Sequence, residues 1–177
     1  VCVNAHTGQE IWRQRWLTTF GCNAADPIVV DDQVFLSSGY NRGSALLDIQ
    51  GSEPTVRWKN KEMQNQISTS VLINGMLFGI HGDVDAGTQL RCVDWKTGDV
   101  NWSDSSFHPG GLTAAGDRLI VLTQSGELVV GNAAADSFVI AASHSVLEGK
   151  CWTSPVLSGG RIFCRSADGE LVAVDVR

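Results

Sequence analysis

The sequence contains no hydrophobic segment long enough to cross a membrane, and it contains few charged residues. Its longest apolar runs, such as 119–122 and 128–130, fall far short of the roughly 18 residues that span a bilayer. Charged residues make up 18% of the 177 residues and hydrophobic residues 43%, which excludes disorder caused by low hydrophobicity and high charge. We therefore expect a folded protein with a sizeable core and no membrane span in this chain.

The sequence also lacks a basic patch. It carries 19 acidic and 13 basic residues, for a net charge of -6, and the basic residues are scattered except for Arg57, Lys59 and Lys61. Proteins that bind nucleic acid use clustered positive charge to neutralise phosphates. We therefore do not expect nucleic acid as a partner.

Common catalytic and metal-binding motifs are absent as well. There is no G-x-S-x-G, no P-loop, no G-x-G-x-x-G followed by a helical pattern, and no C-x-x-C pair. The four histidines are scattered along the chain without Asp or Ser at a defined spacing. The sequence predicts no catalytic residue, no metal site and, in the leading interpretation, no cofactor.

In no stretch long enough for a helix do the hydrophobic residues recur every 3.6 residues. The sequence instead shows a repeated β-hairpin pattern. Two short apolar runs flank a turn of Asp, Asn or Gly in residues 27–35, 70–78, 112–120 and 155–163. These residue types tolerate the positive φ of tight hairpins. The turn residues Asp32, Gly75, Asp117 and Gly160 follow one another at intervals of 43, 42 and 43 residues.

A second landmark follows each hairpin, an apolar run that ends in Asn or Asp. It occurs five times, at Asn4, Asp48, Asp94, Asn132 and Asp175. After two of these positions the chain continues with Thr-Gly and then Trp, which predicts an Asx-type turn into a further strand. The residues of this motif are Asn4, Gly8 and Trp12, Asp94, Gly98 and Trp102, and, with a longer turn, Asp48 and Trp58.

Four short strands in about 43 residues match one blade of a β-propeller. We predict an all-β fold of four-stranded antiparallel blades, forming an open arc of about four blades from a larger propeller of roughly six to eight. The expected divisions are a half blade at 1–16, blades at 23–62, 66–105 and 109–145, and a three-stranded final blade at 151–177. Because the chain opens inside a repeat, we expect it to be the C-terminal part of a longer protein.

The pattern D/N-x-x-T-G-x-x-x-W, carried by residues 4–12 and 94–102, resembles the repeat of the pyrroloquinoline quinone (PQQ) family. The segments 81–83, 90–98 and 151–172 are similar to PQQ-like repeat proteins of planctomycete-type bacteria that are described as BamB-like. The resemblance implies a periplasmic or exported protein. It further implies a noncatalytic scaffold that binds a protein or another ligand of the bacterial cell envelope.

The same resemblance allows an enzyme as the alternative, a fragment of a PQQ-dependent alcohol or sugar dehydrogenase. Catalytic members of that family use calcium held by oxygen ligands, a catalytic Asp and commonly two adjacent Cys, and no Cys-Cys pair occurs here. Asp83 and Asp85 lie with His81 in a Gly-bounded loop, where oxygen ligands could hold a hard cation such as calcium. The competing interpretation is a longer, solvated connection between two strands.

Trp12, Trp58 and Trp102 recur at one position of the repeat, which predicts packing between neighbouring blades. The remaining tryptophans, Trp16, Trp95 and Trp152, break the register and are candidates for an exposed aromatic surface. The loops between blades, and those between second and third strands, open on one face of a propeller. The candidate ligand-facing residues in these loops are Tyr40, Arg42, His81, Asp83 and Trp152.

The cysteines number five, so they cannot all pair with one another. We expect most of them to be small buried hydrophobic residues. One disulfide remains possible if the protein is exported, and the pattern does not identify the pair.

Overall fold

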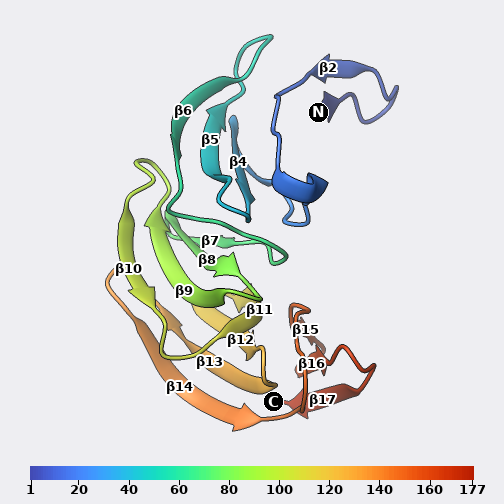
Figure 1. Cartoon of the computed structure of the whole chain (residues 1–177), viewed down its shortest axis with the longest axis vertical. Coiled ribbons are helices and arrows are strands. Elements are labelled where there is room, and N and C mark those ends of the chain that lie inside the picture. Colours follow the sequence, from blue (N-terminus) through green and yellow to red (C-terminus); the bar gives the residue numbers. More distant parts are fainter.

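Each sequence repeat forms one antiparallel sheet of consecutive strands. The computed structural model describes all residues 1–177, and it contains 17 strands and one short 3-10 turn, η1 (Thr19–Gly21), with no α-helix. The strands form five sheets that follow one another around an open arc (Figure 1). This arrangement confirms the predicted all-β propeller fold. No helix of the structure is long and apolar enough to cross a membrane.

The strands of each sheet are hydrogen-bonded in chain order, apart from the missing members of the first and last sheets. The first sheet holds β1 (Cys2–Val3) and β2 (Glu10–Trp12). The second holds β3 (Ile28–Val30), β4 (Gln33–Ser38), β5 (Gly43–Asp48) and β6 (Thr55–Asn60). The third holds β7 (Val71–Ile73), β8 (Met76–Asp83), β9 (Gly87–Asp94) and β10 (Val100–Asp104). The fourth holds β11 (Pro109–Ala115), β12 (Arg118–Thr123), β13 (Glu127–Ala133) and β14 (Phe138–Ser145). The last holds β15 (Val156–Ser158), β16 (Arg161–Arg165) and β17 (Leu171–Asp175).

Tight turns join the first two strands of each complete sheet. At the β7–β8 turn, Asn74 and Gly75 both have positive φ, 50° and 79°. Two left-handed residues in succession give the turn the twist that matches its flanking strands. The Asn, Asp and Gly residues of the repeat therefore set the hairpins.

In two of the repeats, the Asn or Asp at the end of the third strand closes the turn that leads to the fourth. The Asn4 side-chain oxygen accepts hydrogen bonds from the backbone N–H groups of residues 6 and 7, at 2.9 and 3.0 Å. The Asp94 carboxylate accepts the equivalent bonds from residues 96 and 97, at 2.8 and 2.9 Å. Gly8 and Gly98 then take left-handed φ values of 70° and 79°. Asp48 acts differently, because its carboxylate binds the side chains of Arg57 and Gln33.

Hydrophobic clusters fill the junctions between successive sheets. Phe35 and Leu46 of the second sheet pack with Leu77 and Val93 of the third. The next junction joins the third and fourth sheets, and another joins the fourth sheet to the last. The core is therefore divided into layers between blades.

The recurrent tryptophans pack across these junctions. The indole N–H of Trp58 donates to the carbonyl of Trp95 in the next sheet, at 2.9 Å. Trp102 donates in the same way to the carbonyl of Ala134, at 3.0 Å. Trp12 occupies the equivalent place in the first sheet, where it lines a hollow beside the second sheet.

The prediction that Trp95 belongs to an exposed aromatic surface is wrong. Its side chain is only 6% exposed and belongs to the cluster between the second and third sheets. The residue after the Asn or Asp landmark is apolar in all five repeats, as Ala5, Ile49, Trp95, Ala133 and Val176. The backbone N–H of that residue donates to the carbonyl of the first hairpin turn in each sheet that has one. The repeat therefore fixes the backbone contact at this position, and the packing of Trp95 between the second and third sheets buries its side chain.

All five cysteines are free thiols. Cys92, Cys151 and Cys164 are buried within the clusters between sheets. Burial raises the pKa of the Cys92 thiol to about 12 and that of Cys164 to about 11. These thiols act as small apolar side chains.

Candidate functional site

An aromatic and arginine cluster lies on the loop face beside the first and second sheets. We define this loop-face cluster as Trp16, Phe20, Tyr40 and Arg42. Trp16 and Phe20 come from the connection between β2 and β3, and the other two come from the turn between β4 and β5. Two of the predicted ligand-facing residues, Tyr40 and Arg42, therefore lie together.

The β4–β5 turn holds Tyr40 in an uncommon conformation. Tyr40 and Asn41 have φ values of 53° and 61°, and the N–H of Arg42 donates to the carbonyl of Gly39 at 3.1 Å. Left-handed backbone costs free energy for residues other than Gly, and such strain gathers at functional positions. The turn therefore fixes the direction in which the Tyr40 side chain points.

Phe20 meets the Tyr40 ring from outside. The two rings contact edge to face, with 5.2 Å between centroids and an interplanar angle of 82°. Phe20 itself is 85% exposed and also has a positive φ, 59°. A phenylalanine held at the surface in this way offers apolar area to a partner.

Arg42 stacks on Trp16, with its guanidinium carbon 3.6 Å from the ring centroid. The indole N–H of Trp16 donates to the hydroxyl of Ser38 at 2.9 Å, which fixes the ring. The Arg42 Nε is buried and has no hydrogen-bond partner. Stacking therefore positions the guanidinium, while Nε remains an unused donor.

Asp83 joins this region to the third sheet. Its carboxylate accepts a hydrogen bond from the backbone N–H of Tyr40 at 3.0 Å. The side-chain oxygen of Gln66 accepts another from the N–H of Val84 at 2.7 Å. Asp83 therefore supports the β4–β5 turn from the neighbouring blade.

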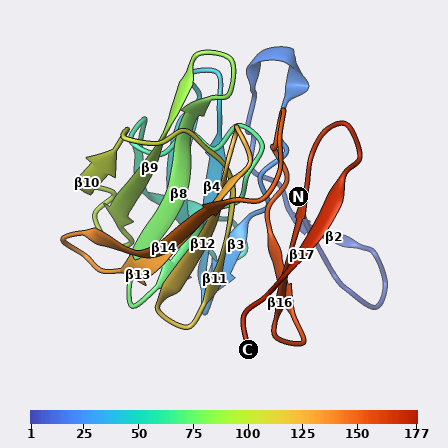
Figure 2. The ribbon, with the colours of Figure 1, turned by 90° about the horizontal axis from the view of Figure 1, so that it is seen from below.

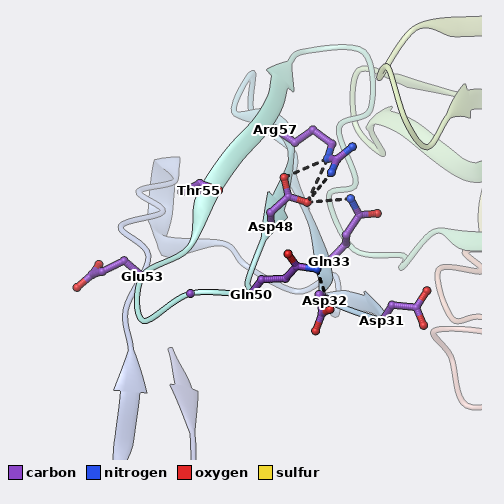
Figure 3. A pocket seen from close by; sticks show the side chains of 9 residues that line it. Asp31, Asp32, Gln33, Asp48, Gln50, Glu53, Thr55 and Arg57 are labelled. Atoms are coloured by element: carbon purple, nitrogen blue, oxygen red, sulfur yellow. Dashed lines mark hydrogen bonds and ion pairs between the residues drawn. The ribbon is translucent and has the colours of Figure 1, made fainter.

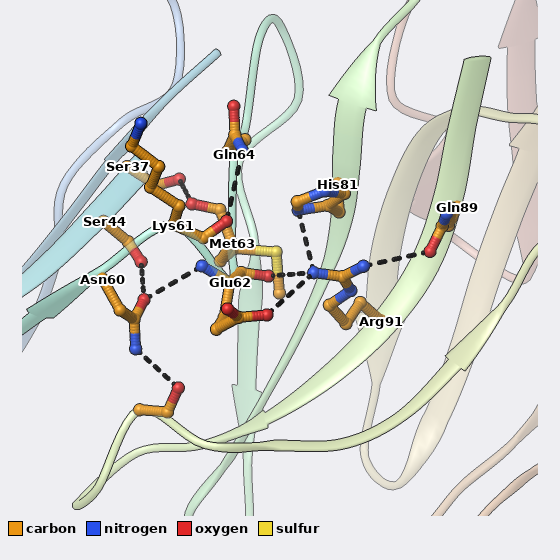
Figure 4. A network of polar contacts seen from close by, with 11 residues as sticks. Ser37, Ser44, Asn60, Lys61, Glu62, Met63, Gln64, His81, Gln89 and Arg91 are labelled. Atoms are coloured by element: carbon orange, nitrogen blue, oxygen red, sulfur yellow. Dashed lines mark hydrogen bonds and ion pairs between the residues drawn. The ribbon is translucent and has the colours of Figure 1, made fainter. Parts of the chain in front are cut away.

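His81 belongs to a separate polar network beneath the connection between β6 and β7 (Figure 4). Arg91 donates to the carbonyl of Glu62 at 2.7 Å, lies 3.2 Å from the His81 Nδ1, and binds Gln89 at 3.1 Å. Burial, and then the charge of Arg91, lower the pKa of His81. His81 and Arg91 lie on neighbouring strands of the third sheet, and Arg91 links them to Glu62 of the connection between the second and third sheets.

Trp152 lies in the connection that leads to the last sheet. Its ring lies under the Lys150 ammonium, 4.6 Å from the centroid, and its buried indole N–H has no partner. No hydrogen bond joins Trp152 to Tyr40, Arg42, His81 or Asp83. The five predicted loop residues therefore occupy three places, and only Tyr40, Arg42 and Asp83 form a continuous group.

Sequence reasoning did not single out Phe20, whose exposure depends on the path of the β2–β3 connection. A Phe-Gly pair in a segment without strand alternation was the available signal. The sequence indicated Trp16 as a break in the repeat register and a candidate for an exposed aromatic surface, without its contact to Arg42. Its contact with Arg42 joins two segments that lie 26 positions apart in the sequence.

A second hollow, of about 490 Å³, opens beside the turns that end β3 and β5 (Figure 3). None of the nine residues that line it is hydrophobic. Asp48 binds Arg57 and Gln33, and Asp32 accepts from Gln50 at 3.1 Å. The hydrogen bonds from Arg57 and Gln33 lower the pKa of Asp48. Many of the polar side chains that line this hollow therefore form hydrogen bonds with one another.

No group of three or more His, Cys, Asp or Glu side chains lies together in a way that could hold a metal ion. The structure places His81 and Asp83 in strand β8 and not in the predicted loop, and there His81 contacts Arg91 and Asp83 binds the Tyr40 backbone. These side chains make contacts with their own chain.

Comparison with known proteins shows the family. The sequence model described as "Outer membrane protein assembly factor BamB" matches residues 1–104 and 86–177. No curated protein sequence matches the chain. Among solved structures, BamB from Moraxella catarrhalis has a TM-score of 0.71 at 17% identity, and the match covers 97% of this chain and 49% of that one. This chain therefore spans about half the length of that BamB.

Two further structures share the fold. The computationally designed Ika4 protein has a TM-score of 0.71 at 11% identity, covering 97% of this chain and all of that one, 100%. A europium-containing methanol dehydrogenase has a TM-score of 0.50 at 19% identity, covering 66% of this chain and 23% of that one. The family match and the repeated antiparallel blades agree, and the chain belongs to the BamB family of PQQ-repeat β-propellers.

Proposed function

We propose that this chain is a noncatalytic scaffold that binds a protein of the bacterial cell envelope, on the periplasmic or exported side. The observation that carries the proposal is the loop-face cluster, in which an 85% exposed Phe20 meets Tyr40 beside the Arg42–Trp16 stack. Trp, Tyr and Arg dominate the energetically important positions of protein interfaces. The family's description as an outer membrane protein assembly factor supports a protein ligand in that compartment.

The geometry of the cluster also suits recognition. The β4–β5 turn is braced by Asp83 of the next blade, and Trp16 is tied to Ser38, so these aromatic rings are ordered before a partner arrives. Preorganised side chains lose less entropy on binding. The Arg42 guanidinium adds a positive charge that favours a carboxylate or backbone carbonyl on the ligand.

Site-specific photo-crosslinking in cells that export the chain tests this proposal. A photoreactive phenylalanine analogue replaces Phe20 in one variant and Val139 in the control, which is 60% exposed on β14. We expect position 20 to crosslink one discrete envelope protein and the control position to leave that protein unlabelled. The crosslink should weaken when Tyr40→Ala is added. Equal labelling from both positions, or none from position 20, would contradict the proposal.

A PQQ-dependent dehydrogenase fragment is the second candidate, favoured by the fold shared with a methanol dehydrogenase. Two residues of the β8–β9 region argue against this candidate, because the Asp83 carboxylate accepts from the Tyr40 N–H and His81 lies beside Arg91. Adding PQQ and calcium and recording the quinone absorbance and dye-linked alcohol oxidation decides between the two. Binding of the quinone with alcohol oxidation would replace the scaffold proposal.

A further inference from the structure

The connection between β6 and β7 runs between two complete sheets and is hydrogen-bonded to both. The second and third sheets pack against each other, and their strands β4 and β8 lie next to one another in Figure 2. On the side of the second sheet, Ser37 Oγ donates to the Met63 carbonyl at 3.0 Å and accepts from the Asn65 N–H at 2.9 Å. On the side of the third sheet, the N–H of Gly82 donates to the Gln64 carbonyl at 3.2 Å. The connection therefore links the two sheets.

One face of the third sheet receives this connection. Gly79 lies opposite Arg91 in the register of β8 and β9, and His81 lies opposite Gln89. Because side chains alternate along a strand and opposed residues share a face, these side chains lie on one face of the sheet. A Cβ at Gly79 would lie 2.8 Å from the Met63 Sδ, so the connection packs closely on this face.

Arg91 holds the start of the connection against this face (Figure 4). Its side chain is 12% exposed, and its Nη1 donates to the Glu62 carbonyl at 2.7 Å and lies 3.4 Å from the Glu62 carboxylate. The same Nη1 lies 3.2 Å from the Nδ1 of His81. A guanidinium has only donors, so Nδ1 must supply a lone pair and the imidazole must be neutral. The arrangement therefore depends on the protonation state of His81.

We propose that His81 is a pH-sensitive switch, whose protonation releases the start of the β6–β7 connection from the third sheet. A proton taken from solvent binds Nδ1 and removes the lone pair that accepts from Arg91. Two cations then lie side by side and repel each other, and the imidazolium N–H competes with Arg91 for the Glu62 carbonyl. Arg91 thereby loses its shortest contact with the connection.

Charged groups from three elements face His81, namely Arg91 on β9, Glu62 on the connection and Asp83 on β8. Burial and then the charge of Arg91 lower the pKa of His81, and they outweigh the opposing effect of the two acids. The neutral ring therefore stabilises the fold fully at pH values above its unfolded pKa, near 6.5. This contribution is lost as the pH falls through the lowered pKa of the folded protein.

Nuclear magnetic resonance of the full chain with labelled histidine measures the titration of His81, and His81→Gln identifies its signal. We expect a pKa below the value that the same residue has in the urea-unfolded chain. Arg91→Gln should raise the pKa of folded His81, because the neighbouring positive charge is removed. A purely structural role for Arg91 would leave that pKa unchanged.

Hydrogen exchange at about pH 7.5 and about pH 5 then follows the connection, with protection factors that correct for the effect of pH on exchange itself. We expect the N–H groups of Asn65 and Gly82 to lose protection at the lower pH. The N–H of Trp95, which donates to the Gly75 carbonyl at 3.0 Å in the same sheet, should keep it. In His81→Gln, whose amide oxygen is an uncharged acceptor, protection should be equal at the two pH values.

A His81 that titrates at or above its unfolded pKa would overturn the proposal. Equal protection of Asn65 and Gly82 at both pH values, or the same loss in His81→Gln, would also overturn it. So would a matching loss at Trp95, because acid would then loosen the whole sheet. Circular dichroism checks that each variant is folded, and the comparison with His81→Gln decides alone if Arg91→Gln does not fold. The crosslinking test at Phe20 is independent of all these outcomes.

Discussion

Replacing Gly98 by Ala should destabilise the protein more than the same change at Gly75. Both glycines have φ of +79° and lie in turns of the third sheet. A left-handed alanine costs about 1–2 kcal/mol at either position. At Gly75 nothing lies within 4 Å of the added Cβ, whereas at Gly98 it would lie 2.6 Å from the Asn60 Nδ2 and 2.8 Å from two ring carbons of Trp58. The Gly98 position therefore carries an additional packing cost.

Displacing a packed aromatic ring costs about 1–3 kcal/mol. We therefore expect about 2–5 kcal/mol for Gly98→Ala and about 1–2 kcal/mol for Gly75→Ala, measured as the free energy of unfolding in urea. The gain from restricting the unfolded chain is the same in both variants and cancels in the comparison.

The Trp58→Ala background supplies the control for this mechanism. Without the ring, the difference between the two glycine substitutions should become smaller, and the part that remains comes from the Asn60 amide; a double-mutant cycle measures the coupling to Trp58. Equal destabilisation of Gly98→Ala and Gly75→Ala in the wild-type background would refute packing of the tryptophan on the turn of the next blade.

Three further predictions concern a tryptophan, the buried thiols and an aspartate. Trp102→Ala should lower the free energy of unfolding by about 3–5 kcal/mol, and an unchanged melting temperature would show that Trp102 does not pack between blades. The pKa of the Cys92 thiol is raised to about 12, so this thiol and the other two buried thiols stay protonated at about pH 8. A thiol reagent should then label only the half-buried Cys2 and Cys22 in the native protein, and all five thiols after denaturation. Because the pKa of Asp48 is lower in the folded protein than in the unfolded chain, its charge stabilises the fold at pH values above the unfolded pKa, near 3.8. This contribution is lost as the pH falls through the pKa of Asp48 in the folded protein. Urea titrations should therefore find wild type more stable than Asp48→Asn at about pH 6 and equal to it in strong acid, and a difference that persists in acid would argue against this assignment.

The repeat made the fold predictable because each landmark has a local physical cause. Asn4 and Asp94 close their turns onto backbone groups only two and three residues away. Hairpin turns such as Asn74-Gly75 likewise depend on the φ preferences of their own residues. The repeat length and the residue types were therefore sufficient to predict contacts between residues that are close together in the sequence.

Contacts between blades were harder to predict, and Trp95 is the clearest case. Its indole donates to Gln33, 62 residues earlier, at 2.7 Å. At the position after the Asn or Asp landmark, one repeat has Trp and the others have Ala, Ile or Val. Because Trp is much larger than these residues, the shared apolar character of the position was not recognised. That column identifies an apolar position, and only the contacts of Trp95 with the second sheet show that its side chain is buried.

The candidate site was predictable only in part, because it combines loops from different blades. Tyr40 and Arg42 were identified from their place between two strands, whereas Phe20 depends on a connection with no repeated pattern. The sequence predicted His81 in a loop, whereas the structure places it in β8 beside Arg91 of β9. The contacts of loop residues depend on tertiary packing, and the repeat length of the sequence does not predict them.

The most direct test of the scaffold function measures the affinity of the crosslinked envelope protein for purified chains by calorimetry. Truncating an interface residue that dominates binding costs at least about 2 kcal/mol, which is roughly a thirtyfold loss of affinity. We predict such a loss for Phe20→Ala and no change for the control Val139→Ala. Equal affinity of the Phe20→Ala and wild-type chains would contradict the assignment of the loop-face cluster as the binding site.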